Sequence, residues 1–132
     1  MEKLDYIIDY LLKECGKEDF DYSNRDKKRL YRALVNRRLP KHISEDFLKV
    51  EDEYLQEELK LSTVIDEKNI IVISKKYDKY NLENADKIAL YKGDITKLKI
   101  DAIVNPGNSQ GLGCFLENHN CLDNQINTFA RY

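Results

Sequence analysis

Two cysteines and a histidine stand within eight residues of one another in the last quarter of this 132-residue chain, at Cys114, His119 and Cys121. Two thiolates and an imidazole are ligands that zinc favours in tetrahedral geometry. Three protein ligands leave a fourth position open, which is typical of reactive zinc sites. By spacing alone, the run fits equally well with two buried thiols and an exposed histidine, because short Cys/His clusters also arise by chance.

A polar, glycine-containing loop precedes this cluster. Residues 105–113 follow an apolar run and hold three of the five glycines. Loops at the carboxyl ends of strands are frequent ligand sites in α/β sheets. Side-chain amides such as those of Asn105 and Asn108 can bond sugar hydroxyls, and glycine amides can cradle a diphosphate. Asn-Pro-Gly-Asn is also an ordinary turn, so the loop alone leaves both interpretations open.

Two carboxylates lie on either side of the loop. Asp94 belongs to a Gly-Asp-Ile-Thr run, where aspartate most often caps a turn. Its functional interpretation is an acceptor for an adenine amino group, with Ile95 behind the ring. Asp123 stands near the start of an expected helix, where it either caps the helix or orients and activates water near a glycosidic carbon.

Helical periodicity dominates the first 60 residues. It predicts a first helix that ends before Gly16, a second over about 25–38 that ends before Pro40, and a third over about 44–60 capped by Ser44. The apolar stripes are Leu4, Ile7, Ile8, Leu11 and Leu12, then Leu30, Leu34 and Val35, then Phe47, Val50, Tyr54 and Leu55. The second helix is basic and the third acidic, which favours two solvated faces over a nucleic-acid patch.

The pattern changes after residue 60, and the prediction becomes an α/β fold. Short β-branched or apolar runs predict buried strands at 70–73, 88–90 and 100–104, with residues 74–86 as a connection. A last helix is expected from Leu122 or Asp123, with Ile126 and either Phe129 or Ala130 on its inner face.

Composition gives the broad class of the chain. Its residues are 42% hydrophobic and 35% charged, which is typical of a folded domain. A net charge of −2 gives no reason to expect nucleic acid or a membrane surface as partner. The N-terminal residues form neither a signal peptide nor a membrane span, so a cytoplasmic location is expected. Cys15 is interpreted as a small buried residue, and in a reducing compartment Cys114 and Cys121 favour metal over a disulfide.

Taken in order, these segments resemble the macrodomain family. The motifs that carry the resemblance are Gly-Asp-Ile-Thr at 93–96, Asp-Ala-Ile-Val-Asn at 101–105 and the following Asn108. The run Gly-Cys-Phe-x4-His-x-Cys-x-Asp-Asn from residue 113 is similar to the zinc-dependent bacterial subfamily, which is often encoded beside a sirtuin-type ADP-ribosyltransferase and a lipoyl carrier protein. The resemblance is close over about 85–130. It implies a mainly helical N-terminal extension over 1–84 and, over 85–132, the first part of a three-layer α/β/α macrodomain.

The resemblance also implies roles at the adenine and ribose ends of ADP-ribose. Asp94 and Ile95 would meet the adenine, and Asn105 would line the distal ribose. Asn108 would lie closer to that ribose and, with Asp123, would act in catalysis. The implied reaction is hydrolysis of an ADP-ribosyl group from a modified protein, with a lipoyl carrier protein as one candidate partner.

The same resemblance implies a zinc ion beside the distal ribose, bound by Cys114, His119 and Cys121. The zinc would polarise or position groups of the ribose. The loop 106–113 would wrap the ribose and diphosphate, and its glycines are Gly107, Gly111 and Gly113.

Several positions depart from the family pattern. Pro106 and Gly107 stand where two small residues are usual, Glu117 where Pro is frequent, Asn127 where the family has His, and Arg131 where it has Gly. The chain stops at Tyr132, before the further strands and the second phosphate-binding loop that a complete macrodomain needs. We therefore expect a truncated chain with impaired hydrolysis. The alternative is an ADP-ribose-binding module, or an inactive zinc-binding remnant, without turnover.

Overall fold

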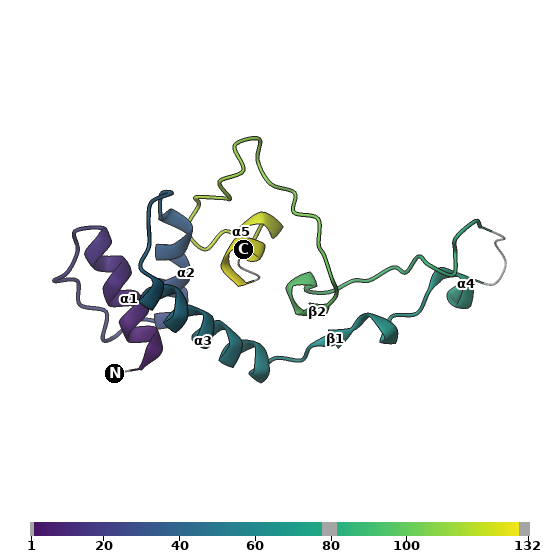
Figure 1. Cartoon of the computed structure of the whole chain (residues 1–132), viewed down its shortest axis with the longest axis horizontal. Helices are drawn as coiled ribbons and strands as arrows, with labels where there is room; N and C mark the ends of the chain where they lie inside the picture. Colours follow the sequence, from purple (N-terminus) through teal and green to yellow (C-terminus); the bar gives the residue numbers. More distant parts are fainter. Residues whose placement is uncertain (1, 78–81, 130–132) are drawn as a thin grey trace. The chain divides into compact units, whose positions relative to one another are not determined.

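The computed structural model describes residues 2–77 and 82–129 (Figure 1). They form two compact units. The first joins residues 2–58 to residues 104–129, and the second spans the described residues between 59 and 103. The predicted division near residue 84 concerns the family relationship of the segments rather than their packing, and it stays a prediction.

Four helices build the first unit: α1 (Lys3–Glu14), α2 (Lys27–Arg37), α3 (Glu45–Leu61, whose last turn reaches the second unit) and α5 (Leu122–Phe129). The three N-terminal helices and the last one are confirmed. Ser44 caps α3 as predicted, since its Oγ accepts a hydrogen bond from the Phe47 backbone N–H at 3.2 Å. Asp26 caps α2 in the same way through Arg29 N–H. Gly16 follows α1 with a φ of +66°, a conformation that favours glycine.

The first three helices share one apolar core. Its buried members are Ile7, Ile8, Leu11, Leu12, Tyr31, Phe47 and Tyr54. The Tyr31 and Tyr54 rings meet edge to face at 5.4 Å between centroids, an arrangement that aromatic pairs prefer. The predicted stripe of α2 is only half-buried, because Tyr31 rather than Leu34 lies at the centre of the contact.

Two sequence-based predictions about this unit are wrong. The prediction of a solvated acidic face on the third helix fails at Glu51, which is buried and accepts a hydrogen bond from the Tyr31 hydroxyl at 2.9 Å. That donor explains how a carboxylate is accommodated beside the core. Cys15 was expected to be buried, but it is exposed, because it follows the last turn of α1 rather than lying on its inner face.

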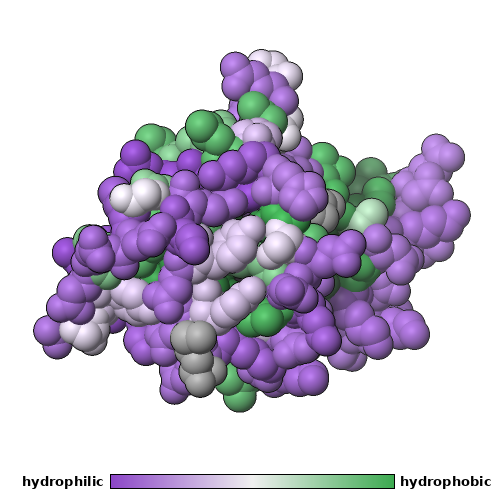
Figure 2. Space-filling view, turned by 60° about the vertical axis from the view of Figure 1, so that its left-hand side comes forward, coloured by the Kyte–Doolittle hydropathy of each residue, from purple (hydrophilic) through white to green (hydrophobic). Residues whose placement is uncertain are grey.

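Most of the remaining charge lies at the surface, as predicted. Hydrophilic residues dominate the face that Figure 2 shows. Some cations of α2 pair with neighbouring helices, as in Lys27–Asp5 to α1 at 2.7 Å and Lys28–Glu58 to α3. In the described residues, no helix combines the length and the apolar character needed to cross a bilayer.

The second unit is built mainly from loops and short elements. Strand β1 (Ile65–Asp66) pairs in parallel with β2 (Leu98–Lys99), in the register Ile65 to Leu98. Two 3₁₀ turns, η1 (Glu67–Asn69) and η2 (Ile95–Lys97), and one helical turn, α4 (Ile73–Lys76), accompany this pair. Helices with a small parallel sheet are consistent with the expected α/β class, whereas the three-layer macrodomain arrangement stays a prediction.

The three predicted strands of this region are wrong. Ile73 opens α4, and residues 70–72 and 88–90 contribute only a single bridge between Val72 and Ala89. Residues 100–104 form no strand, and Val104 is 89% exposed. A short apolar run becomes a strand only where another backbone pairs with it and covers one face. Among the described residues, the first two runs pair with each other only at that bridge, and 100–104 pair with no strand.

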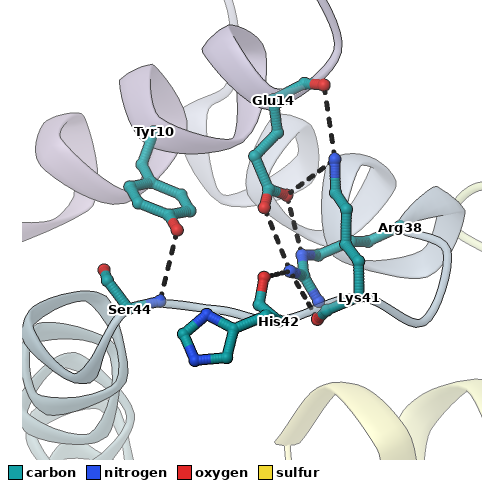
Figure 3. A network of polar contacts seen from close by, with 6 residues as sticks. All are labelled: Tyr10, Glu14, Arg38, Lys41, His42 and Ser44. Atoms are coloured by element: carbon teal, nitrogen blue, oxygen red, sulfur yellow. Dashed lines mark hydrogen bonds and ion pairs between the residues drawn. The ribbon is translucent and has the colours of Figure 1, made fainter.

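A network of polar contacts fastens the end of α1 to the connection between α2 and α3 (Figure 3). The Glu14 carboxylate accepts hydrogen bonds from Arg38 Nε at 2.7 Å and Nη2 at 3.0 Å. Arg38 Nη2 also donates to the carbonyls of Lys41 and His42. The hydrogen bond to Glu14 raises the pKa of the Arg38 guanidinium. One guanidinium therefore donates hydrogen bonds both to a carboxylate and to two backbone carbonyls in the bend before α3.

We expect the Glu14→Gln variant to be less stable by about 1–3 kcal/mol, because the mostly buried Arg38 would lose its charged partner. The matched control is Glu53→Gln, whose carboxylate is 46% exposed in its pair with Lys3 and should change stability by less than about 0.5 kcal/mol. Chemical denaturation of the two variants measures both free energies. Equal losses would contradict the special role of the Glu14 pair.

Candidate metal centre and the loop around it

The cysteine–histidine cluster predicted from spacing comes together in the first unit. The ligand atoms of Cys114, His119 and Cys121 all lie within 4.8 Å of one another. The Cys114 Sγ to His119 Nδ1 distance is 3.4 Å. Both cysteines are half-buried and the histidine is exposed, so the cluster is open to solvent on the histidine side.

This arrangement fits a tetrahedral zinc ion. Zinc–sulfur bonds of about 2.3 Å and zinc–nitrogen bonds of about 2.0–2.1 Å imply ligand-to-ligand separations of about 3.5–3.8 Å. The observed 3.4 Å between Cys114 Sγ and His119 Nδ1 is close to that edge, and it equally suits a thiol–imidazole hydrogen bond. Two thiols and one imidazole are also the right donor types. The three residues could therefore hold the ion with small side-chain adjustments.

The first turn of α5 supports two of the three ligands. The Asn124 backbone N–H donates to Cys121 Sγ at 3.4 Å. The Asn124 side chain, fully buried, donates from Nδ2 to the carbonyls of Cys114 at 3.3 Å and Leu116 at 3.0 Å. Hydrogen bonds around metal ligands fix their orientation. Asn124 therefore holds both sides of the cluster at once.

Helix α2 also contributes to the cluster, and the sequence analysis missed it. Arg32 Nη2 donates to the His119 carbonyl and, at 2.9 Å, to Asn124 Oδ1. One turn later, Asn36 Oδ1 accepts from the Asn118 backbone N–H at 3.2 Å, and its Nδ2 donates to Thr128 Oγ1 at 2.9 Å. The sequence did contain a signal for this face of α2. Arg32 and Asn36 are four residues apart, so they lie on one side of the helix, beside its apolar stripe.

Asp123 is buried in the first turn of α5, where a negative charge is favoured. Its Oδ1 accepts hydrogen bonds from Asn105 Nδ2 at 2.8 Å and from Asn127 Nδ2 at 2.9 Å. Asn127 was noted in the sequence only as a departure from a family histidine, and its contact with Asp123 was not anticipated. The structure thus brings Asp123 and Asn105 together, as expected for one site.

Asn105 presents an unusual feature at this point. Its Oδ1 is buried and has no hydrogen-bond partner among the described residues, although its Nδ2 is engaged by Asp123. Buried polar atoms are rarely left unsatisfied, and each such atom calls for an explanation. A ligand that donates a hydroxyl hydrogen would satisfy this acceptor. Gly107 lies beside the other end of this amide, since a Cβ at Gly107 would stand 3.6 Å from Asn105 Nδ2 and 3.8 Å from Asp123 Oδ1.

Asn108 uses both ends of its amide to shape the loop. Its Nδ2 donates to the Gly113 carbonyl at 2.7 Å, and its Oδ1 accepts from the Gln110 backbone N–H at 3.0 Å. Gly111 and Gly113 adopt φ values of +67° and +77°. The turn of this loop lies at 108–111, where the Gly111 N–H donates to the Asn108 carbonyl at 3.0 Å, and not at the predicted Asn-Pro-Gly-Asn of 105–108. The catalytic role predicted for Asn108 stays a prediction.

Asp94 lies in the second unit, separate from the unit that holds the cysteines. Its Oδ1 accepts from the Thr96 backbone N–H at 3.0 Å and from Thr96 Oγ1 at 2.7 Å. The side chain thus caps η2, which agrees with the turn-capping interpretation of the motif. Ile95 is half-buried in the same turn. Adenine binding by Asp94 and Ile95 stays a prediction.

Comparison with known proteins gives the site a biochemical context. No family model matches the chain. The chain is similar to protein-ADP-ribose hydrolases. One from Treponema medium is 37% identical over 133 residues, which cover 98% of this chain and 48% of the relative. Another, from Staphylococcus aureus strain MRSA252, is 38% identical over 131 residues, covering 97% of this chain and 45% of the relative. The chain thus spans about half the length of these curated relatives.

A third relative matches a shorter stretch more closely. A probable bifunctional ADP-ribose hydrolase/ADP-ribosyltransferase from Fusarium oxysporum f. sp. cubense is 53% identical over 47 residues. The match covers 35% of this chain and 8% of the relative. The printed names of these three relatives all contain ADP-ribose hydrolase, and none specifies a metal.

We expect the purified chain to bind about one zinc ion, and Cys114→Ser, Cys121→Ser and His119→Ala each to lose most of it. The matched control is Cys15→Ser, because Cys15 is an exposed cysteine that lies outside the cluster. Elemental analysis after gel filtration measures the metal content. Equal zinc content in the cluster variants and the native chain would contradict the site.

A glycine pair tests how tightly the loop is packed. Gly111 and Gly113 both have positive φ, so alanine costs about 1–2 kcal/mol at either position. Only at Gly113 would the new Cβ crowd a neighbour, the Asn127 side chain at 3.1 Å. We expect Gly113→Ala to lower the unfolding free energy more than Gly111→Ala, as measured by chemical denaturation. A larger loss of unfolding free energy for Gly111→Ala would show that crowding against Asn127 does not affect stability.

Proposed function

We propose that this chain carries the distal-ribose and zinc site of a protein-ADP-ribose hydrolase. The observation that carries the proposal is the environment of Asp123. Its carboxylate is buried in the first turn of α5, bonded to Asn105, and two residues from Cys121. The similarity to protein-ADP-ribose hydrolases over 98% of the chain supports the same reaction.

The two carboxylate oxygens of Asp123 differ in their hydrogen bonding. Both side-chain donors reach Oδ1, and within the described residues no hydrogen bond is made to Oδ2. Two amide donors orient the carboxylate without neutralising its charge. We propose that Oδ2 accepts a proton from a water molecule as that water attacks C1 of the distal ribose. The bond from C1 to the modified protein side chain then breaks, and that side chain leaves with the bonding electrons.

The loop side of the site would bind the sugar and the diphosphate. The buried, unpartnered Oδ1 of Asn105 is proposed to accept a hydrogen bond from a ribose hydroxyl. The backbone at Gly107, Gly111 and Gly113 is proposed to wrap the ribose and diphosphate, since glycine allows close approach. Asn108, whose side chain bonds the Gly113 carbonyl across this loop, is proposed to contact the distal ribose during catalysis.

Cys114, His119 and Cys121 would hold the zinc ion. When bound, zinc supplies a Lewis acid that polarises or orients oxygen atoms of the distal ribose. The half-buried thiols and the exposed histidine leave the solvent side of the cluster accessible to a ligand. Asp94 and Ile95 are proposed to meet the adenine.

The substrate is proposed to be an ADP-ribosylated protein, with a lipoyl carrier protein as one candidate. Because the chain spans about half the length of its curated relatives, we expect the 132 residues to hydrolyse such a substrate slowly. The alternative proposal is an ADP-ribose-binding module, or a zinc-binding remnant, without turnover. The observation that favours it is the buried, unpartnered Oδ1 of Asn105, because a hydroxyl of bound ADP-ribose would satisfy it whether or not hydrolysis follows.

The test incubates the zinc-loaded chain with an ADP-ribosylated protein and measures free ADP-ribose. We expect slow release that a chelator abolishes and that Asp123→Asn reduces at least about tenfold, because general-base catalysis contributes about 10²–10⁴-fold. Glu117→Gln is the control, since Glu117 is an exposed carboxylate that pairs with Arg37. Calorimetric binding of ADP-ribose without release would favour the binding module. Equal release by Asp123→Asn and the native chain would contradict the assigned base.

A further inference from the structure

We infer that Arg32 is a positioning residue for the metal cluster, and that helix α2 is thereby a structural part of the site. The inference rests on the proposed zinc site. It assigns a role to a residue that lies 87 positions before His119 in the chain.

The contacts of Arg32 reach all three ligand residues directly or through one intermediate. Its Nη2 donates to the backbone carbonyl of His119, and its Nε and Nη2 donate to Asn124 Oδ1 at 3.3 and 2.9 Å. Asn124 in turn donates from its backbone to Cys121 Sγ and from its side chain to the Cys114 carbonyl. One guanidinium therefore fixes His119 and the residue that orients both cysteines.

Arginine is suited to this task by its shape. The planar guanidinium offers several N–H donors in a rigid fork, so it can hold two acceptors at a fixed separation. Its plane is supported from α5, because the Arg32 guanidinium carbon lies 5.7 Å from the centroid of the Phe129 ring. Within the described residues, no carboxylate forms an ion pair with Arg32, and its side-chain hydrogen bonds go to the ligand segment and α5.

The second contact between α2 and this segment acts further from the ligands. Asn36 accepts from the Asn118 backbone and donates to Thr128, both of which flank the cluster rather than form it. Asn118 has a φ of +52°, a left-handed conformation that asparagine adopts more readily than most residues. Of these two α2 side chains, Arg32 is therefore the one whose contacts reach the ligand residues themselves.

The consequence concerns metal affinity more than the fold. Three ligands held in place before the ion arrives lose little freedom on binding, and loss of the groups that orient ligands costs about 10–100-fold in affinity. We therefore expect Arg32→Met to weaken Co²⁺ and Zn²⁺ binding by about 10–100-fold. Arg32→Lys keeps the charge and a single donor nitrogen but not the planar fork, so we expect a smaller, several-fold loss.

The experiment titrates the full chain with Co²⁺, whose thiolate charge-transfer and ligand-field absorption bands report the ligand geometry, and then displaces it with Zn²⁺. Arg29→Met is the matched control, because Arg29 lies three residues earlier on the same helix and, among the described residues, its side chain makes no hydrogen bond to the cluster. Chemical denaturation of each metal-free variant separates affinity from folding. Arg29→Met should bind like the native chain.

The outcomes separate this inference from the site on which it rests. If the native chain binds no metal ion, the zinc site fails and the role of Arg32 fails with it. If the native chain binds Co²⁺ but Arg32→Met binds it equally well with the same spectrum, only the role of Arg32 is overturned. Should Arg32→Met fail to fold, Arg32→Lys decides the question: native-like affinity overturns the inference, and a several-fold loss with altered absorption bands supports it.

Discussion

The packing of α5 against α2 is the constraint on which the rest of the site depends. The metal-ligand segment has little regular structure of its own, and the loop before it is held mainly by turns. Its shape therefore comes from hydrogen bonds to two helices. Arg32 and Asn36 reach it from α2, while Asn124 reaches it from α5. The aromatic and aliphatic core of the first three helices matters to the chemistry because it fixes the face of α2 that carries these donors.

The helical part of the fold could be predicted because its signals are local. Periodic apolar residues define α1 to α3, and Ser44 marks the start of α3, so spacing and capping suffice there. The strands could not be predicted in the same way. A run such as 100–104 carries the composition of a strand, yet pairing depends on a second backbone that composition does not reveal. For the same reason β1 and β2, which do pair, were missed, since two residues in each are too few to leave a pattern.

The same difference between local signals and long-range packing applies to the candidate site. Cys114, His119 and Cys121 are close in sequence, so their spacing sufficed to indicate that they meet. Arg32 is far from them in sequence and has no motif, and its role follows only from the packing of α2 against α5. Asn127 shows a third case. It stood out as a departure from a family pattern, but only the structure relates that departure to Asp123.

That departure has a physical consequence for the proposed chemistry. An asparagine at position 127 is a neutral donor whose amide hydrogens are never lost near neutral pH, unlike the ring of a histidine. With Asn105 as the second donor, the Asp123 carboxylate has two partners whose charge does not change with pH. Both amides therefore orient the carboxylate without placing a titrating charge at its Oδ1. Asn127, which stands where the macrodomain resemblance implies a histidine, thus contributes orientation of the carboxylate and no proton of its own.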